Sequence, residues 1–132
     1  MLNSSETRRK IDNFCAQTGK YHPDAYEFIT SCVIAQVNSL EKARHLSARE
    51  LLEGLKKQIH ANFGFLADNV LESWHIKTPS DIGEIVFDLI ELNILSASED
   101  DKRSDFDIAM PLTDPETVRK IAPQMEIPKI DC

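Results

Sequence analysis

The chain has 132 residues, with 22 acidic and 15 basic side chains, a formal net charge of −7 at pH 7 and three cysteines. This length allows one domain with its own hydrophobic core, and no apolar run reaches the roughly 20 residues that a membrane-spanning helix needs. The first ten residues lack the apolar stretch of a secretory signal, and Cys15, Cys32 and Cys132 form no CxxC pair. A disulfide framework and a zinc site are therefore disfavoured, and we expect a cytosolic protein.

Acidic residues are concentrated in the second part of the chain. Residues 1–77 contain 10 basic and 9 acidic side chains, a net charge of +1, whereas residues 78–132 contain 5 basic and 13 acidic side chains, a net charge of −8. A polyanionic ligand would be repelled by the second part and only weakly attracted elsewhere.

Two helices are predicted before residue 41. Residues 6–18 carry Ile11, Phe14 and Cys15 at helical spacing and end at Gly19. Residues 24–40 are more apolar and follow Pro23, which suits the first position of a helix. The β-branched residues of this second segment leave a strand as an alternative.

Three further helices are predicted between residues 47 and 92. The first, 47–63, begins with a capping box formed by Ser47 and Glu50, and Gly64 suits its left-handed end. The second covers residues 66–75.

The third helix of this group, 79–92, is capped by Thr78 and has Pro79 at its first position. Its interior glycine, Gly83, indicates a close helix-to-helix approach, since glycine there costs about 1 kcal/mol relative to alanine.

Beyond Asn93 the helical pattern ends, and apolar residues recur at every second position. Residues 94–98, a turn at 99–102, and then Phe106, Ile108 and Met110 in alternation predict a β-hairpin. Three helices followed by a hairpin is the element order of a winged helix, with residues 94–110 as the wing.

The predicted fold class is mainly α (α+β), with a winged-helix-like three-helix core, a following β-hairpin and two additional N-terminal helices. Another small α+β arrangement stays open. The predicted organisation is an N-terminal helix at 1–20, a helical core with its hairpin at 21–110, and a proline-rich, partly disordered tail at 111–132.

Longer strings of residues resemble a known family. "HLSARELLEGLKKQIHANFG", "VLESWHIKTPSDIGEIVFDLIELNIL" and the later "DF" are similar to an uncharacterised family of small bacterial proteins associated with planctomycetes, verrucomicrobia and chlamydiae. The resemblance spans residues 21–108. Ala48 and His75 stand where the family has Gly, Ile82 where it has Phe, and Asp88 where it has Asn. The family has no established activity, so the resemblance implies kinship without a mechanism and argues against shared chemistry at His75 or Asp88.

Four carboxylates share one face of the helix at 79–92: Asp81, Glu84, Asp88 and Glu91. A helix that reads DNA needs cations for the phosphates and donors for the base edges. This helix has neither Lys nor Arg, which argues against specific DNA binding. Its polar face is either solvated or a docking surface for a basic partner protein.

Cations are available on another part of the chain. The candidates for nucleic-acid contact are Lys42, Arg44, Arg49, Lys56 and Lys57. Interleaved glutamates at 41, 50 and 53 dilute this patch, so ordinary surface charge is the simpler reading.

No catalytic motif is recognisable. The four histidines form no HExxH pattern, and four glycines form no phosphate-binding loop. We therefore expect no catalytic residue, metal or cofactor. The sequence favours a non-enzymatic protein-interaction or regulatory module that docks a partner through the acidic helix and hairpin. The alternative is a winged-helix DNA-binding regulator that uses the basic side of the 47–63 helix and the wing.

Overall fold

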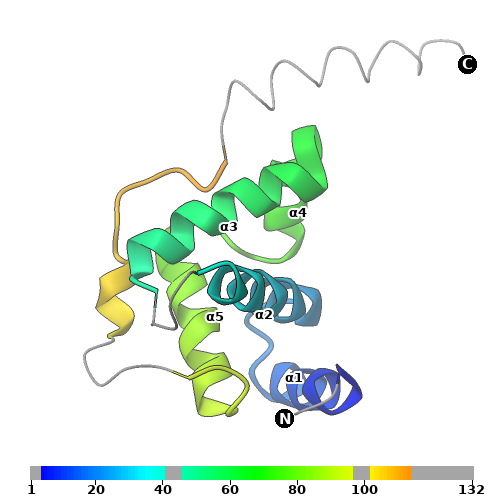
Figure 1. Cartoon of the computed structure of the whole chain (residues 1–132). Coiled ribbons are helices and arrows are strands. Elements are labelled where there is room, and N and C mark those ends of the chain that lie inside the picture. Colours follow the sequence, from blue (N-terminus) through cyan, green and yellow to red (C-terminus); the bar gives the residue numbers. More distant parts are fainter. Residues whose placement is uncertain (1–3, 41–45, 97–101, 114–132) are drawn as a thin grey trace, which may run out of the picture.

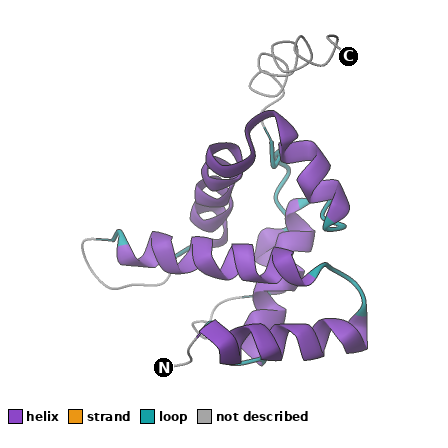
Figure 2. Cartoon of the chain, turned by 90° about the vertical axis from the view of Figure 1, so that its right-hand side faces the viewer, coloured by secondary structure: helices purple, strands orange, loops and turns teal. Residues whose placement is uncertain are grey.

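The computed structural model describes residues 4–40, 46–96 and 102–113. In these ranges the chain forms helices joined by loops, and no strand (Figure 2). The mainly helical class is therefore confirmed. The elements are α1 (Ser4–Thr18), α2 (Pro23–Asn38), α3 (Ala48–Phe63), the 3-10 helix η1 (Gly64–Leu66), α4 (Ala67–Ser73), α5 (Pro79–Glu91) and the 3-10 helix η2 (Arg103–Phe106).

The helix starts follow the predicted capping residues. Ser47 Oγ accepts the Glu50 N–H at 3.1 Å, and Glu50 Oε1 accepts the Ser47 N–H at 3.0 Å, which confirms the capping box of α3. At α2 the cap is His22, which was not predicted from the sequence: its Nδ1 accepts the Asp24 N–H at 3.0 Å. These bonds satisfy amide groups that have no partner inside the helix.

The core lies between α2, α3 and α5. Figure 1 shows α1, α2 and α3 one above the other, with α5 running along their side. Each of the three central helices buries one stripe of its surface, as the spacing of apolar residues predicts. The largest fully buried side chains are Tyr26, Ile11, Ile29, Leu52, Leu55, Ile59, Ile82, Ile85 and Leu89.

Polar contacts attach α1 to the other helices. Arg8 forms ion pairs with Asp24 and Glu27 of α2, and Lys10 Nζ donates to the Leu92 carbonyl at 3.0 Å. The predicted division of the chain at residues 20 and 110 stays a prediction, and most of the predicted tail, 114–132, lies outside the described residues.

The predicted wing is wrong in the part of 94–110 that the structure describes. Ile94 and Leu95 close the end of α5, since both N–H groups donate to the Leu89 carbonyl, at 2.9 and 3.2 Å. Most of the expected turn falls on residues 97–101, outside the described ranges.

The second predicted strand is replaced by local turns. Phe106 ends η2, the Ile108 N–H donates to the Phe106 carbonyl at 2.8 Å, and the Met110 N–H donates to the Ile108 carbonyl at 3.0 Å. Bonds between residues two apart are those of successive γ-turns. This arrangement gives apolar residues a spacing of two without a partner strand, which explains why the sequence pattern was misleading.

Two residues other than glycine have positive φ angles. His75, after α4, has φ 68°, and Asn93, after α5, has φ 62°. Gly64 ends α3 with φ 52°, as expected, although its ψ of −126° places it outside the left-handed helical region. No described helix is long and apolar enough to cross a membrane.

Candidate functional site

The predicted acidic face of α5 is largely engaged in contacts within the protein. Asp81 Oδ1 accepts the Tyr21 hydroxyl at 2.7 Å, and its Oδ2 accepts the Lys77 and Thr78 N–H groups at 2.7 and 3.1 Å. Asp88 is buried, and its Oδ2 accepts the hydroxyl of the buried Tyr26 at 2.8 Å. Two of the four carboxylates therefore contribute to the fold.

Arg103 of η2 contacts the other two carboxylates and Asp88. Its guanidinium nitrogens lie 3.3 Å from Glu84, 3.6 Å from Asp88 and 3.3 Å from Glu91. The Glu91 side chain remains 66% exposed, against 36% for Glu84 and 12% for Asp88. Negative charge that reaches solvent on this face is therefore greatest at Glu91.

The environments of the two aspartates shift their pKa values in opposite directions. Burial raises the pKa of Asp88, although the bond from Tyr26 and the charge of Arg103 act against it. Burial also acts to raise the pKa of Asp81, but the N–H groups of Lys77 and Thr78 and the Tyr21 hydroxyl lower it overall. Burial and the facing carboxylates raise the pKa of both tyrosines.

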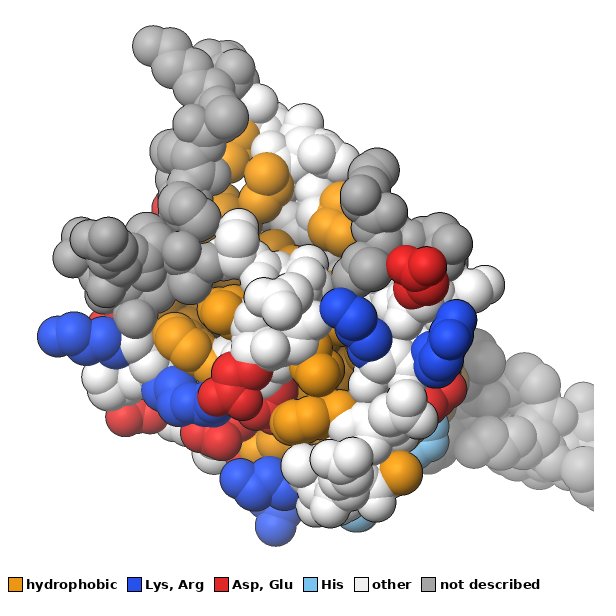
Figure 3. All heavy atoms as spheres, turned by 90° about the horizontal axis from the view of Figure 1, so that it is seen from below, with side chains coloured by type: hydrophobic (Ala, Val, Ile, Leu, Met, Phe, Trp, Pro, Cys, Tyr) orange, Lys and Arg blue, Asp and Glu red, His pale blue; other side chains and the backbone are white. Residues whose placement is uncertain are grey.

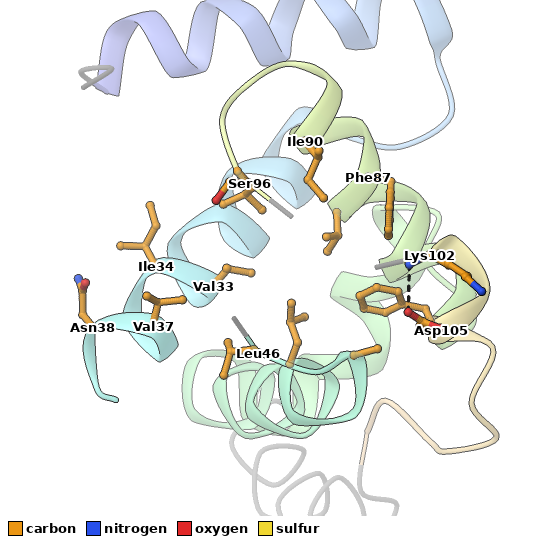
Figure 4. Close-up of a pocket in the computed structure, with 15 residues that line it drawn as sticks. Val33, Ile34, Val37, Asn38, Leu46, Phe87, Ile90, Ser96, Lys102 and Asp105 are labelled. Atoms are coloured by element: carbon orange, nitrogen blue, oxygen red, sulfur yellow. Dashed lines mark hydrogen bonds between the residues drawn. The ribbon is translucent and has the colours of Figure 1, made fainter. Parts of the chain in front are cut away.

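An apolar groove lies beside this face, between α2, α3, α5 and η2. Its cavity volume is about 280 Å³. In Figure 4, Val33 of α2 and Phe87 and Ile90 of α5 point toward one another across the cavity. The lining residues are Val33, Ile34, Val37, Asn38, Leu46, Ala48, Leu51, Val86, Phe87, Ile90, Leu95, Ser96, Lys102, Asp105 and Phe106.

The α2 side of the groove carries two exposed aliphatic side chains. Ile34 is 48% exposed and Val37 is 39% exposed, and Figure 4 labels both among the α2 residues that line the cavity. From below, hydrophobic side chains gather on the surface around a hollow, with acidic and basic side chains beside them (Figure 3). Water-exposed aliphatic groups that adjoin an apolar hollow are typical of interaction sites.

The helix η2 forms one wall of the groove because it packs closely on α5. A Cβ atom on Gly83 would lie 2.6 Å from Phe106 Cβ, so only glycine permits this contact. The expected close approach at Gly83 therefore exists, but its neighbour is a buried phenylalanine of η2. Ser80 also donates a hydrogen bond to Asp107.

Phe87 connects the groove to the acidic face. Its side chain lines the groove, and the Arg103 Cζ atom lies 5.4 Å from the centre of its ring. A cation above an aromatic face is attracted electrostatically. The position of Arg103 is thus coupled to the groove wall.

The basic residues do not form an equivalent site in the described part of the chain. Arg49 pairs with Glu53 at 3.3 Å, Lys56 is half-buried and Lys57 is exposed. Lys42 and Arg44 lie outside the described residues. Over the described ranges, no group of three or more His, Cys, Asp or Glu residues is placed to hold a metal ion.

Sequence reasoning missed the groove. The sequence feature that indicates the groove is an apolar helix face wider than the single stripe needed to contact the core. On α2, Ile34 stands beside Val33, and on α5, Phe87 stands beside Val86. The sequence does not specify which of these residues face a neighbouring helix and which line a groove, because that depends on where η2 packs.

No family model, curated protein or solved structure matches the chain. The resemblance to the family of small bacterial proteins therefore stays a prediction from the residues themselves.

Proposed function

We propose that the protein is a non-enzymatic interaction module that binds an apolar segment of a partner protein in the groove between α2, α3, α5 and η2. The observation that carries the proposal is the apolar lining of this groove together with the exposure of Ile34 and Val37 beside it. Apolar area removed from water contributes about 25 cal/mol per Å² to binding, before the costs of association.

The size and lining of the groove favour binding over catalysis. A cavity of about 150 Å³ takes up one benzene molecule, so 280 Å³ accommodates about two large apolar side chains. The described lining contains neither histidine nor cysteine, and Asp105 is its one carboxylate. Lys102 is its one basic side chain, and most of the remaining residues supply apolar anchoring contacts.

The acidic face keeps a narrower role in this proposal. Asp81 and Asp88 stabilise the fold, whereas Glu84 and Glu91 provide charge at the margin of the docking surface. Replacing an acidic residue of this face by lysine tests that role. Asp88 is unsuitable for the replacement, because a lysine there would be an unpaired cation against buried Tyr26. Glu91, which is the most exposed of the three Arg103 contacts, is the suitable position.

The two buried free thiols, Cys15 and Cys32, fit a reducing compartment. We therefore place the module in the cytosol as part of the proposal.

A photo-crosslinking amino acid at position 34 tests the function directly. In native cells it should join the protein to a partner, and Val37→Glu in the same chain should abolish the product. The matched control is a crosslinker at Ser31, which is exposed on α2 and does not line the groove.

Equal products from positions 31 and 34, unaffected by Val37→Glu, would contradict the groove. Duplex DNA binding that weakens steeply with salt and is lost on neutralising Lys56 and Lys57 would support the DNA-binding alternative instead.

A further inference from the structure

We infer that the occupant of the groove is an amphipathic helix of another protein, with apolar anchors on one face and lysine or arginine residues beside them. This inference rests on the proposed function and specifies the partner class of the same site. It is carried by the shape of the groove walls, the cavity size and the charge around the lining.

The walls have the shape that receives a helix. On α2 the lining residues Val33, Ile34 and Val37 occupy positions i, i+1 and i+4, and on α5 Val86, Phe87 and Ile90 repeat that spacing. Two such rows form ridges with a furrow between them, into which the ridge of a third helix packs. Partner anchors at i, i+3, i+4 and i+7 match this geometry.

An extended peptide is a poorer fit. A strand binds by adding to an open sheet edge, where main-chain groups are free to pair. The described residues contain no strand, and most of the groove lining lies on helices, whose backbone groups are already bonded within the helix. The partner must therefore satisfy its own backbone, and a helix does so.

The charge of the walls favours a cationic partner. Within the described residues 78–96 and 102–113, six acidic side chains stand against two basic ones, a net charge of −4. On α2, Asp24 and Glu27 pair with Arg8 of α1, and α3 carries three basic and two acidic side chains. The surplus of negative charge therefore lies on the α5 and η2 side of the groove. Complementary charge around an apolar patch steers association and selects the partner.

The same charge argues against a second copy of this chain as the occupant. With a net charge of −7, two copies repel each other, and each would bring acidic side chains toward an acidic margin. A nucleic acid or an anionic lipid surface meets the same repulsion.

The experiment uses the full chain and a fluorescent, leucine–lysine amphipathic peptide of about 18 residues, long enough for five helical turns. A second peptide keeps every leucine and replaces lysine by glutamate. A third has the composition of the first, with two central D-residues that break the helix. Fluorescence anisotropy gives the dissociation constant of each.

The leucine–lysine peptide should bind at least about tenfold more tightly than each of the other two. Ile34→Glu with Val37→Glu should weaken its binding by about tenfold or more. The added glutamates increase the negative charge, so attraction by charge alone would strengthen binding. Weaker binding therefore reports the apolar groove. The control, Ser31→Glu with Ala35→Glu, changes the same helix by the same charge outside the groove and should not weaken binding.

The remaining outcomes separate the two proposals. Equal, groove-dependent binding of the lysine and glutamate peptides would overturn the cationic partner and leave the docking function standing. Binding that survives Ile34→Glu with Val37→Glu would overturn the groove as its site, and an absence of binding by all three peptides would overturn both proposals. A doubled mass in light scattering, reversed by the peptide, would assign the groove to a second copy and overturn the inference.

Discussion

Tyr26 of α2 donates its hydroxyl proton to Asp88 of α5 across 2.8 Å, and both residues are buried. The bond joins positions 62 residues apart in the chain. A buried carboxylate is tolerated only where partners replace the water that it loses. This pair therefore fixes how the two main walls of the groove lie against each other.

Tyr26→Phe should lower the free energy of unfolding by about 2 kcal/mol, because the buried Asp88 carboxylate loses a hydrogen bond. Tyr21→Phe is the matched control, since Asp81 keeps the N–H groups of Lys77 and Thr78. That variant should lose about 1 kcal/mol. Urea unfolding followed by circular dichroism measures both values. A larger loss for Tyr21→Phe would contradict the assigned importance of the Tyr26–Asp88 bond.

The two aspartates should influence the pH dependence of stability with opposite signs. The pKa of Asp88 is raised by burial, so its stabilising contribution is complete below the ordinary carboxyl pKa and is lost as the pH rises through its folded value. The pKa of Asp81 is lowered overall, so its contribution is present above the ordinary pKa and is lost as the pH falls through its folded value.

Asp88→Asn should therefore become more stable relative to the natural protein as the pH rises through the carboxyl range. Asp81→Asn should become less stable relative to it over the same range. Unfolding free energies between about pH 3 and pH 7 measure both trends. Trends of the same sign for the two variants would show that the electrostatic assignment is wrong.

Gly83→Ala should destabilise the protein by about 1–3 kcal/mol, because the new methyl group overlaps Phe106. At Gly54, the other glycine inside a helix, a Cβ atom meets the flexible end of Gln36. Gly54→Ala should instead stabilise the protein by up to about 1 kcal/mol through helix propensity. Thermal unfolding compares the two.

A second substitution tests the cause of the Gly83 effect. In a Phe106→Gly background, which removes the Cβ atom as well as the ring, the space above residue 83 is open, so adding Gly83→Ala should no longer destabilise the protein. A loss that persists in this background would mean that the clash lies elsewhere.

His75→Gly should raise the free energy of unfolding by about 1 kcal/mol, because His75 has a φ of 68° that costs a side-chain-bearing residue conformational energy. Asn93→Gly, at φ 62°, should raise the free energy of unfolding by only a few tenths of a kcal/mol, since asparagine tolerates this region of φ. Differential scanning calorimetry distinguishes them. An equal or larger gain at Asn93 would rule out strain at His75.

The helices were predictable because their signals are local. Ser47 with Glu50 specifies the start of α3, and the expected helices at 47–63 and 79–92 correspond to Ala48–Phe63 and Pro79–Glu91. Capping and apolar spacing act within a few residues, so the sequence alone defines them.

Two features that the sequence did not specify depend on contacts across the chain. The acidic residues of α5 suggested an open docking face, yet Tyr26 and Arg103 come from distant segments and engage them. The groove arises in the same way, because Phe106 lines it only when η2 packs at Gly83. Local periodicity contains no information about such pairings.

The γ-turns after η2 have a consequence for self-association. An exposed strand presents a row of unpaired N–H groups that recruits other chains and promotes aggregation. Here the N–H groups of Ile108 and Met110 are already bonded within their own segment. These apolar residues therefore follow the spacing of a sheet edge without offering their amides as a template for fibrils.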